Sequence, residues 1–227
     1  ILPAGLAAYF AQFLPSIIEG NHHRFEYEWV PSLDISLTLH VDGLSLLFAL
    51  LISVIGTFVV IYGGGYLRHD KDIAKFYVYL LAFMASMLGL VLSDNLISLF
   101  IFWELTSVMS FMLIGYYHDV EEFRNSAHQS FLVTFGGGLV MMVGLVTLAM
   151  IGADAGLQGT DTYSLRALLS LDPGAITGHA LYVPTLLMLL AGCFTKSAQF
   201  PFHFWLPNAM AGPTPVSSYL HSATMIK

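Results

Sequence analysis

Charged side chains are scarce in this sequence of 227 residues, in which they make up 10% of the total. Hydrophobic residues make up 56%, and the mean hydropathy is +0.73. Soluble domains carry roughly a quarter charged residues, so the composition excludes that class and indicates a protein of the lipid bilayer. The net charge of -7 argues against nucleic acid as a partner.

Cysteine is nearly absent, since Cys193 is the only one. A single thiol cannot build a disulfide framework, a zinc quartet or an iron–sulfur site. His22 and His23 have no spaced set of carboxylates or cysteines beside them, so we interpret them as solvated loop histidines. We therefore expect no metal site and no cofactor.

A basic amino-terminal region of the signal-peptide type is also missing. The sequence begins at Ile1 and ends at Lys227, inside a predicted helix. We therefore interpret residues 1–227 as a single membrane domain and the N-terminal fragment of a longer chain.

Long uncharged runs predict an all-α, polytopic transmembrane helix bundle. Residues 43–66 carry no charge, and Asp42 is a suitable N-cap for that helix. The glycines at 136–138 favour close helix approach within another run. In all we predict about seven membrane segments, near residues 2–18, 43–66, 76–93, 96–117, 129–152, 180–210 (broken) and 214–227 onwards.

The loops predict the orientation of these segments. Residues 19–42 are polar and acidic, and residues 154–178 carry three aspartates, so both are expected to be external loops. Lysine and arginine are more frequent in the short connections that the positive-inside rule places in the cytoplasm. The inner set is Arg68, Lys71, Lys75 and Arg124, whereas the outer set is Arg24 and Arg166.

Lys196 follows an apolar run of about four helical turns and is therefore expected at a depth where charge is costly. Pro201 lacks an amide hydrogen and clashes with the carbonyl of Ser197, so it should stop or kink the helix just past the lysine. A helix broken at membrane depth is tolerated only where protein or a watery cavity satisfies its free carbonyls. Lys196 is thus predicted to line a cavity.

Glu104 is the second predicted intramembrane charge, in the sequence Phe-Trp-Glu-Leu-Thr-Ser. Its short side chain cannot reach either membrane surface, so it should face the bundle interior and pair with Lys196. Separating such a pair in a medium of low dielectric would favour the neutral forms and release a proton from the lysine. The alternative is a static salt bridge that fixes helix packing.

Three further residues extend the predicted proton path. His203 lies beyond Pro201, and His221 and Lys227 are about 9 Å apart along the last helix, so waters or hydroxyls would have to bridge them. His203 could instead bind a freed backbone carbonyl. Haem ligation by the histidines is disfavoured, because no second matched pair exists.

Three motifs carry a resemblance to a known family. They are Trp103-Glu104-Leu-Thr-Ser, Thr195-Lys196-Ser-Ala-Gln-Phe-Pro, and Trp205-Leu-Pro-Asn-Ala-Met-Ala-Gly-Pro-Thr-Pro-Val-Ser with His221-Ser-Ala-Thr-Met. The sequence resembles the proton-translocating antiporter-like subunits shared by respiratory complex I and the multi-subunit Mrp cation/proton antiporters. The resemblance begins near Val41 and runs to the end of the sequence.

The resemblance implies a repeat-based bundle with a discontinuous helix after Lys196. It assigns the central pair to Glu104 and Lys196, the onward proton transfer to Lys227, and polar relay positions to His203 and His221. Complex I relatives of the closest type carry Gly-Asp in the sixth helix, where this chain has glycine at 137 and 138. The chain therefore looks most like the large A subunit of an Mrp antiporter.

The resemblance leads us to expect a proton-translocating, multi-pass subunit in a prokaryotic-type cell membrane, coupled to Na⁺ or another monovalent cation and assembled with other antiporter subunits. It would be a secondary transporter rather than an enzyme. One alternative is a proton-pumping arm subunit of a complex I-type NADH:quinone oxidoreductase or a membrane-bound hydrogenase. Another is a scaffold that transports nothing.

Overall fold

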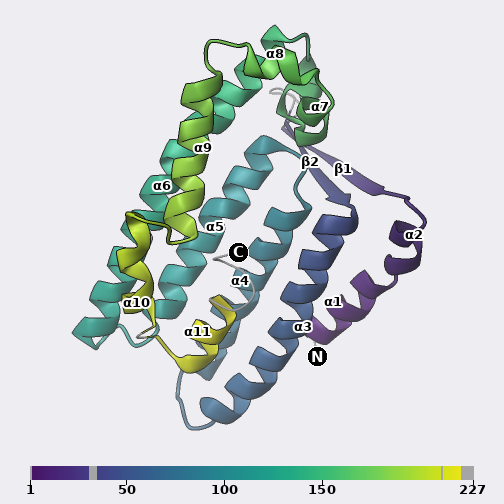
Figure 1. The fold of residues 1–227 in the computed structure, drawn as a ribbon. Coiled ribbons are helices and arrows are strands. Elements are labelled where there is room, and N and C mark those ends of the chain that lie inside the picture. The colour runs from purple at the N-terminus through teal and green to yellow at the C-terminus, as the bar shows by residue number, and fades with distance from the viewer. Residues whose placement is uncertain (1, 31–34, 211, 221–227) are drawn as a thin grey trace.

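The computed structural model describes residues 2–30, 35–210 and 212–220 and is mostly helical (Figure 1). In this part of the chain, 4 helices are long and apolar enough to cross a membrane. The chain is thus a multi-pass membrane protein that is mostly helical, as expected. The four helices are α3 (Gly43–Tyr66), α4 (Ile73–Leu92), α5 (Leu96–Ile114) and α6 (Glu121–Asp154).

Helix α3 begins where the sequence predicts because Asp42 and Ser45 form a reciprocal cap. The carboxylate of Asp42 accepts the backbone N–H of Ser45 at 2.8 Å, and the hydroxyl of Ser45 accepts the backbone N–H of Asp42 at 2.8 Å. Two of the donors that a helix start leaves unpaired are thereby satisfied. Asn95 caps α5 in a related way, through the N–H groups of Ile97 and Ser98.

The other long helices differ from their predicted limits. Helix α4 begins at Ile73, so Lys75 lies in its first turn rather than in the connection, and α5 ends at Ile114. Helix α6 begins at Glu121, well before residue 129, because a polar turn can extend a helix beyond its apolar part. Glu121 and Glu122 suit the positive end of the helix dipole there.

Residues 19–42 are not simply the loop that the sequence predicts. Two strands, β1 (His23–Val30) and β2 (Ile35–Val41), pair antiparallel across one end of the bundle. The period-2 alternation in Ser36-Leu-Thr-Leu-His-Val41 is typical of a strand. The alternation is short and follows a run rich in acidic residues, so it is a weak signal beside the polarity of the segment.

Residues 154–178 also form more structure than the expected loop. They contain the 3₁₀ helix η2 (Gly159–Tyr163) and two short helices, α7 (Leu165–Leu169) and α8 (Pro173–Thr177). Asp94 holds this segment to the link between α4 and α5, through bonds from the hydroxyl of Ser164 and the backbone N–H of Arg166. The strands and α7 meet at the same end of the bundle (Figure 1).

Only shorter helices lie in the described parts of the other three predicted membrane segments, so the structure does not confirm these as membrane spans. The first is split into α1 (Leu2–Ala11) and α2 (Leu14–Ile18), and α1 packs against α3. The segment at 180–210 consists of α9 (Tyr182–Lys196), the 3₁₀ helix η3 (Phe202–Phe204) and α10 (Trp205–Ala209). Helix α11 (Thr214–Tyr219) starts the last segment, and the remainder of that prediction lies outside the described residues.

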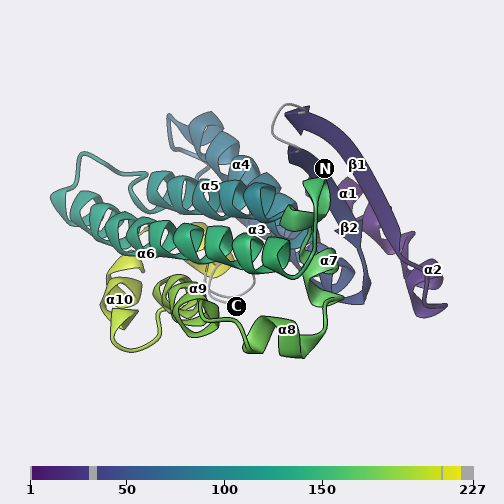
Figure 2. The ribbon, with the colours of Figure 1, turned by 90° about the horizontal axis from the view of Figure 1, so that it is seen from above.

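Helix α6 lies between α5 and α9, as the view from above shows (Figure 2). Contacts between α6 and both neighbours bring segments that are nearly a hundred residues apart in sequence to a common interior. This arrangement places the two predicted intramembrane charges, on α5 and α9, in the same part of the bundle.

Candidate functional site

Lys196 is the last residue of α9 and is 3% exposed. Its ammonium group donates three hydrogen bonds, all to α5: to the carbonyl of Trp103 at 2.8 Å, the hydroxyl of Thr106 at 2.6 Å and the hydroxyl of Ser107 at 2.7 Å. The Trp103 ring centroid is 5.0 Å from the same nitrogen. Three donors therefore meet three acceptors, which fully satisfies a charged lysine.

The backbone conformation after Lys196 ends α9, and a hydrogen bond from the indole of Trp205 stabilises that end. Ala198 has a positive φ of 51°, which ends the helical path just after Lys196, and the peptide between Phe200 and Pro201 is cis. The indole N–H of Trp205 donates to the carbonyl of Thr195 at 2.9 Å. That bond satisfies a carbonyl left free at the helix end, as the protein interior requires.

Glu104 does not form the direct ion pair with Lys196 that the sequence predicts. Among the described residues, both oxygens of its carboxylate are buried without a hydrogen-bond partner, and so is the indole nitrogen of Trp103. The carboxylate lies instead against Gly138 of α6. The structure thus shows Lys196 held by neutral oxygens. Glu104, the residue after Trp103, has a carboxylate without a hydrogen-bond partner among the described residues.

Two glycines make this approach of three helices feasible. A β-carbon at Gly138 would collide with the Glu104 carboxylate, and one at Gly137 would collide with the Thr195 side chain. A β-carbon at Gly136 would meet no atom within 4 Å. The prediction that glycines permit close approach therefore holds for Gly137 and Gly138 but not for Gly136.

Of the predicted relay residues beyond Lys196, the structure describes His203 alone. His203 lies in η3, is exposed, and stacks on Phe200 with 6.0 Å between ring centroids. His221 and Lys227 lie outside the described residues. Their predicted roles therefore stay predictions.

Sequence reasoning missed Thr106 and Ser107 as functional residues. The available signal was their spacing, because residues i, i+3 and i+4 share one face of a helix, and Trp103, Thr106 and Ser107 follow that spacing. Hydroxyl residues are common in membrane helices, where they bond to their own backbone. Spacing alone therefore could not identify them as lysine ligands.

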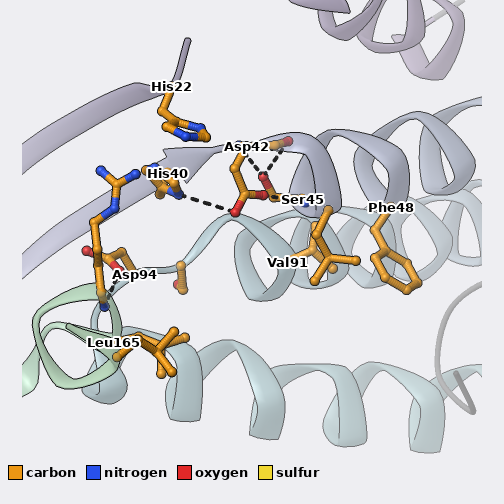
Figure 3. A pocket seen from close by; sticks show the side chains of 12 residues that line it. His22, His40, Asp42, Ser45, Phe48, Val91, Asp94 and Leu165 are labelled. Atoms are coloured by element: carbon orange, nitrogen blue, oxygen red, sulfur yellow. Dashed lines mark hydrogen bonds and ion pairs between the residues drawn. The ribbon is translucent and has the colours of Figure 1, made fainter. Parts of the chain in front are cut away.

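A cavity of about 460 Å³ lies away from the lysine cluster, at the β-strand end of the bundle (Figure 3). The Nδ1 atom of His40 lies 3.8 Å from the Asp42 carboxylate there, and Asp94 and Arg166 also line the cavity. Burial, followed by the charge of Arg166, lowers the pKa of His40 below its ordinary value. This cavity shares no lining residue with the lysine cluster.

Neither of these two places, as far as the described residues define them, resembles a metal centre. In residues 2–30, 35–210 and 212–220, no group of three histidine, cysteine, aspartate or glutamate side chains is arranged to hold an ion. The groups around Lys196 are one carbonyl and two hydroxyls, and they bind its ammonium group.

The fold and the lysine cluster together define a class: a multi-pass membrane protein with a buried lysine and a buried glutamate carboxylate between its helices. Intramembrane ionisable residues of this kind mark ion or proton pathways. A family model described as "NADH:quinone oxidoreductase/Mrp antiporter, TM" matches residues 93–227. The chain belongs to this family. A second model, for the N-terminus of complex I chain 5, matches residues 29–77.

Two of the similar relatives are named as antiporter subunits. The chain is 47% identical over 228 residues to a putative antiporter subunit mnhA2 of Staphylococcus epidermidis, and 48% identical over 228 residues to the A subunit of the Na(+)/H(+) antiporter of Alkalihalophilus pseudofirmus. Each match covers 100% of this chain and 27% of the relative. The chain thus spans about a quarter of the length of the curated relatives it matches.

A solved structure shows the same fold. The Mrp complex from Dietzia sp. DQ12-45-1b includes a chain that matches with a TM-score of 0.80 and 34% sequence identity. The match covers 98% of this chain and 24% of that chain.

Proposed function

We propose that this chain is part of a proton-translocating component of a multi-subunit monovalent cation/proton antiporter, with Na⁺ as the expected cation. The observation that carries the proposal is the Lys196 cluster: a buried lysine at the end of α9, tied to α5 beside a Glu104 carboxylate that has no hydrogen-bond partner among the described residues. Similarity to antiporter subunits from two bacteria supports the choice of cation and complex.

The arrangement suits proton transfer because α5 offers the lysine two kinds of acceptor, neutral oxygens on one side and the Glu104 carboxylate on another. Neutral oxygens hold the ammonium group in the present state, while the Glu104 carboxylate is free to take a proton or the ammonium. In a low-dielectric interior, changing the distance between two opposite charges changes the stability of both charged forms. Movement of Lys196 would thereby couple its position to its protonation.

The proposed path continues through His203, His221 and Lys227. Helices α9 and α10 would be the two halves of one discontinuous membrane segment, and the complete set would comprise about seven segments in the cell membrane. The end of α9 at Lys196 and the separate start of α10 at Trp205 support this assignment. On this proposal, the protein is a secondary transporter and carries out no chemical conversion.

Transport measurements on the assembled complex in vesicles test the proposal. Lys196→Ala and Glu104→Gln should each lower cation-dependent proton movement at least about tenfold, since each removes a group that must bind the proton. Lys75→Ala and Glu121→Gln are matched controls, because they remove exposed charges of the same type. Full transport by Lys196→Ala would contradict the proposal and favour a scaffold.

A redox-driven proton pump is the second candidate, because the matching family model includes NADH:quinone oxidoreductases. The local chemistry at Glu104 and Lys196 would be the same. Purification with flavin or iron–sulfur subunits would favour this candidate. Cation-dependent pH change in vesicles that lack an electron donor would favour the antiporter.

A further inference from the structure

We propose that the carbonyl of Trp103 and the hydroxyls of Thr106 and Ser107 form a docking station for the charged form of Lys196, which competes with Glu104 for the same ammonium group. This inference rests on the proposed function and adds two positioning residues to it. Lys196 would alternate between this station on α5, occupied in the present structure, and the Glu104 carboxylate.

The station is a built site, because its three oxygens converge from one helix face. Trp103, Thr106 and Ser107 lie on adjacent turns of α5, and their distances to the lysine nitrogen are 2.6 to 2.8 Å. Thr106 and Ser107 are both fully buried. The hydroxyl of Thr106 also donates to the carbonyl of Trp103 at 2.6 Å, so its hydrogen is directed away from the ammonium and its lone pairs remain available to it.

The charge of the lysine decides how firmly the station holds it. An ammonium group has three N–H donors and no acceptor, so it matches the three oxygens. Hydrogen bonds from an ionised donor are roughly twice as strong as bonds between neutral groups, and a neutral amine has only two N–H donors. The station therefore holds Lys196 while it is charged and weakens its hold when the proton leaves.

Glu104 provides the competing acceptor. It follows Trp103 directly in sequence, but its carboxylate lies against Gly138 rather than on the face that holds the lysine. Among the described residues its oxygens have no hydrogen-bond partner, and an unpartnered buried carboxylate is a strong acceptor for an ammonium group or a proton. Without the two hydroxyls, one carbonyl would remain for Lys196, and the balance would move toward a fixed pair with Glu104.

The test compares variants that differ in the hydroxyl group. In vesicles that contain the assembled complex, Thr106→Val combined with Ser107→Ala should lower cation-dependent proton movement about tenfold or more, because bonds to a charged group are lost. Thr106→Ser keeps the hydroxyl and should retain most activity. Ser110→Ala is the matched control, since the Ser110 hydroxyl is buried on the same helix but donates to the backbone carbonyl of Ser107 rather than binding Lys196.

Two results would overturn the inference. One is transport at the normal rate by the double variant while Lys196→Ala is inactive, which would leave the proposed function intact. The other is equal loss of transport in Thr106→Val and Thr106→Ser, which would show a packing role. Normal activity of Lys196→Ala would instead defeat the proposed function.

A structural measurement decides the matter independently of transport. In an electron cryomicroscopy structure of the assembled complex with Ser107→Ala or the double variant, the Lys196 nitrogen should lie within ion-pair distance of the Glu104 carboxylate. An unchanged lysine position in these variants would overturn the competition. The single variant Ser107→Ala removes one oxygen atom, so it serves if the double variant does not assemble.

Discussion

The carboxylate of Glu104 occupies the space that a β-carbon on Gly138 would require. This relationship joins α5 to α6 at the level of the lysine cluster and fixes the side on which the acid lies. Gly138 therefore acts on the site through its lack of a side chain. Its neighbour Gly137 does the same for Thr195 on α9.

Gly138→Ala should displace Glu104 and lower transport by the assembled complex severalfold or more. A methyl group cannot fit against the carboxylate without movement of α5 or of the acid itself, and small displacements in a catalytic or transport site have large effects on rate. Proton movement in vesicles is the measurement. Gly136→Ala, where a β-carbon meets nothing within 4 Å, is the control and should behave like the unmodified protein.

The cap of α3 can be tested by Asp42→Ala, which should lower the free energy of unfolding by about 1 kcal/mol because a backbone donor loses its acceptor. Thermal denaturation of the purified protein in detergent would measure the loss. Asp72→Ala is the matched control, since Asp72 stands before α4 but forms no side-chain cap. Equal effects of the two substitutions would show that capping is not responsible.

His40 should make the protein less stable in mild acid. Burial lowers its pKa below its ordinary value of 6.5, with Arg166 and His22 acting in the same direction and Asp42 and Asp94 opposing it. The folded protein therefore binds this proton less readily than the unfolded chain. Stability from this source is present above the unfolded pKa and is lost as pH falls from about 6.5 through the folded pKa.

Melting temperatures measured across that pH window would check the His40 prediction. His40→Gln, which cannot take up a proton, should flatten the decline between neutral and mildly acidic pH. His118→Gln is a suitable control, because His118 is exposed and lies in the connection between α5 and α6. A decline that is unchanged by His40→Gln would assign the pH dependence to other groups.

Asp94→Ala should loosen the segment that carries α7. Asp94 is 5% exposed, and its carboxylate accepts from the hydroxyl of Ser164 at 3.1 Å and the backbone N–H of Arg166 at 3.0 Å. Loss of the acceptor leaves these donors unsatisfied, at a cost of about 1–3 kcal/mol. Faster amide hydrogen exchange in residues 159–169 would show the loosening.

Asp172→Ala provides the comparison for Asp94→Ala, since Asp172 precedes α8 without a side-chain capping bond. Its effect on hydrogen exchange should be small. If both substitutions loosened the segment equally, the carboxylate of Asp94 would not be its anchor.

Sequence patterns predicted those features that depend on local composition. The uncharged run at 43–66 and the cap at Asp42 correspond to α3 at both ends. Glu104 and Lys196 were identified because charges are rare in apolar runs, and the structure places both among buried groups. The β1–β2 pair and the start of α6 were missed, because strand alternation and a polar helical turn are weak signals beside strong hydropathy.

By itself, the sequence determined that this chain enters a membrane and which two charged residues lie among apolar ones. These properties follow from composition and spacing along a single segment. Only the tertiary structure decided that Lys196 is held by Thr106 and Ser107 rather than by Glu104. The choice of acceptor depends on how closely α5, α6 and α9 pack, and that distance is set by contacts among residues far apart in sequence.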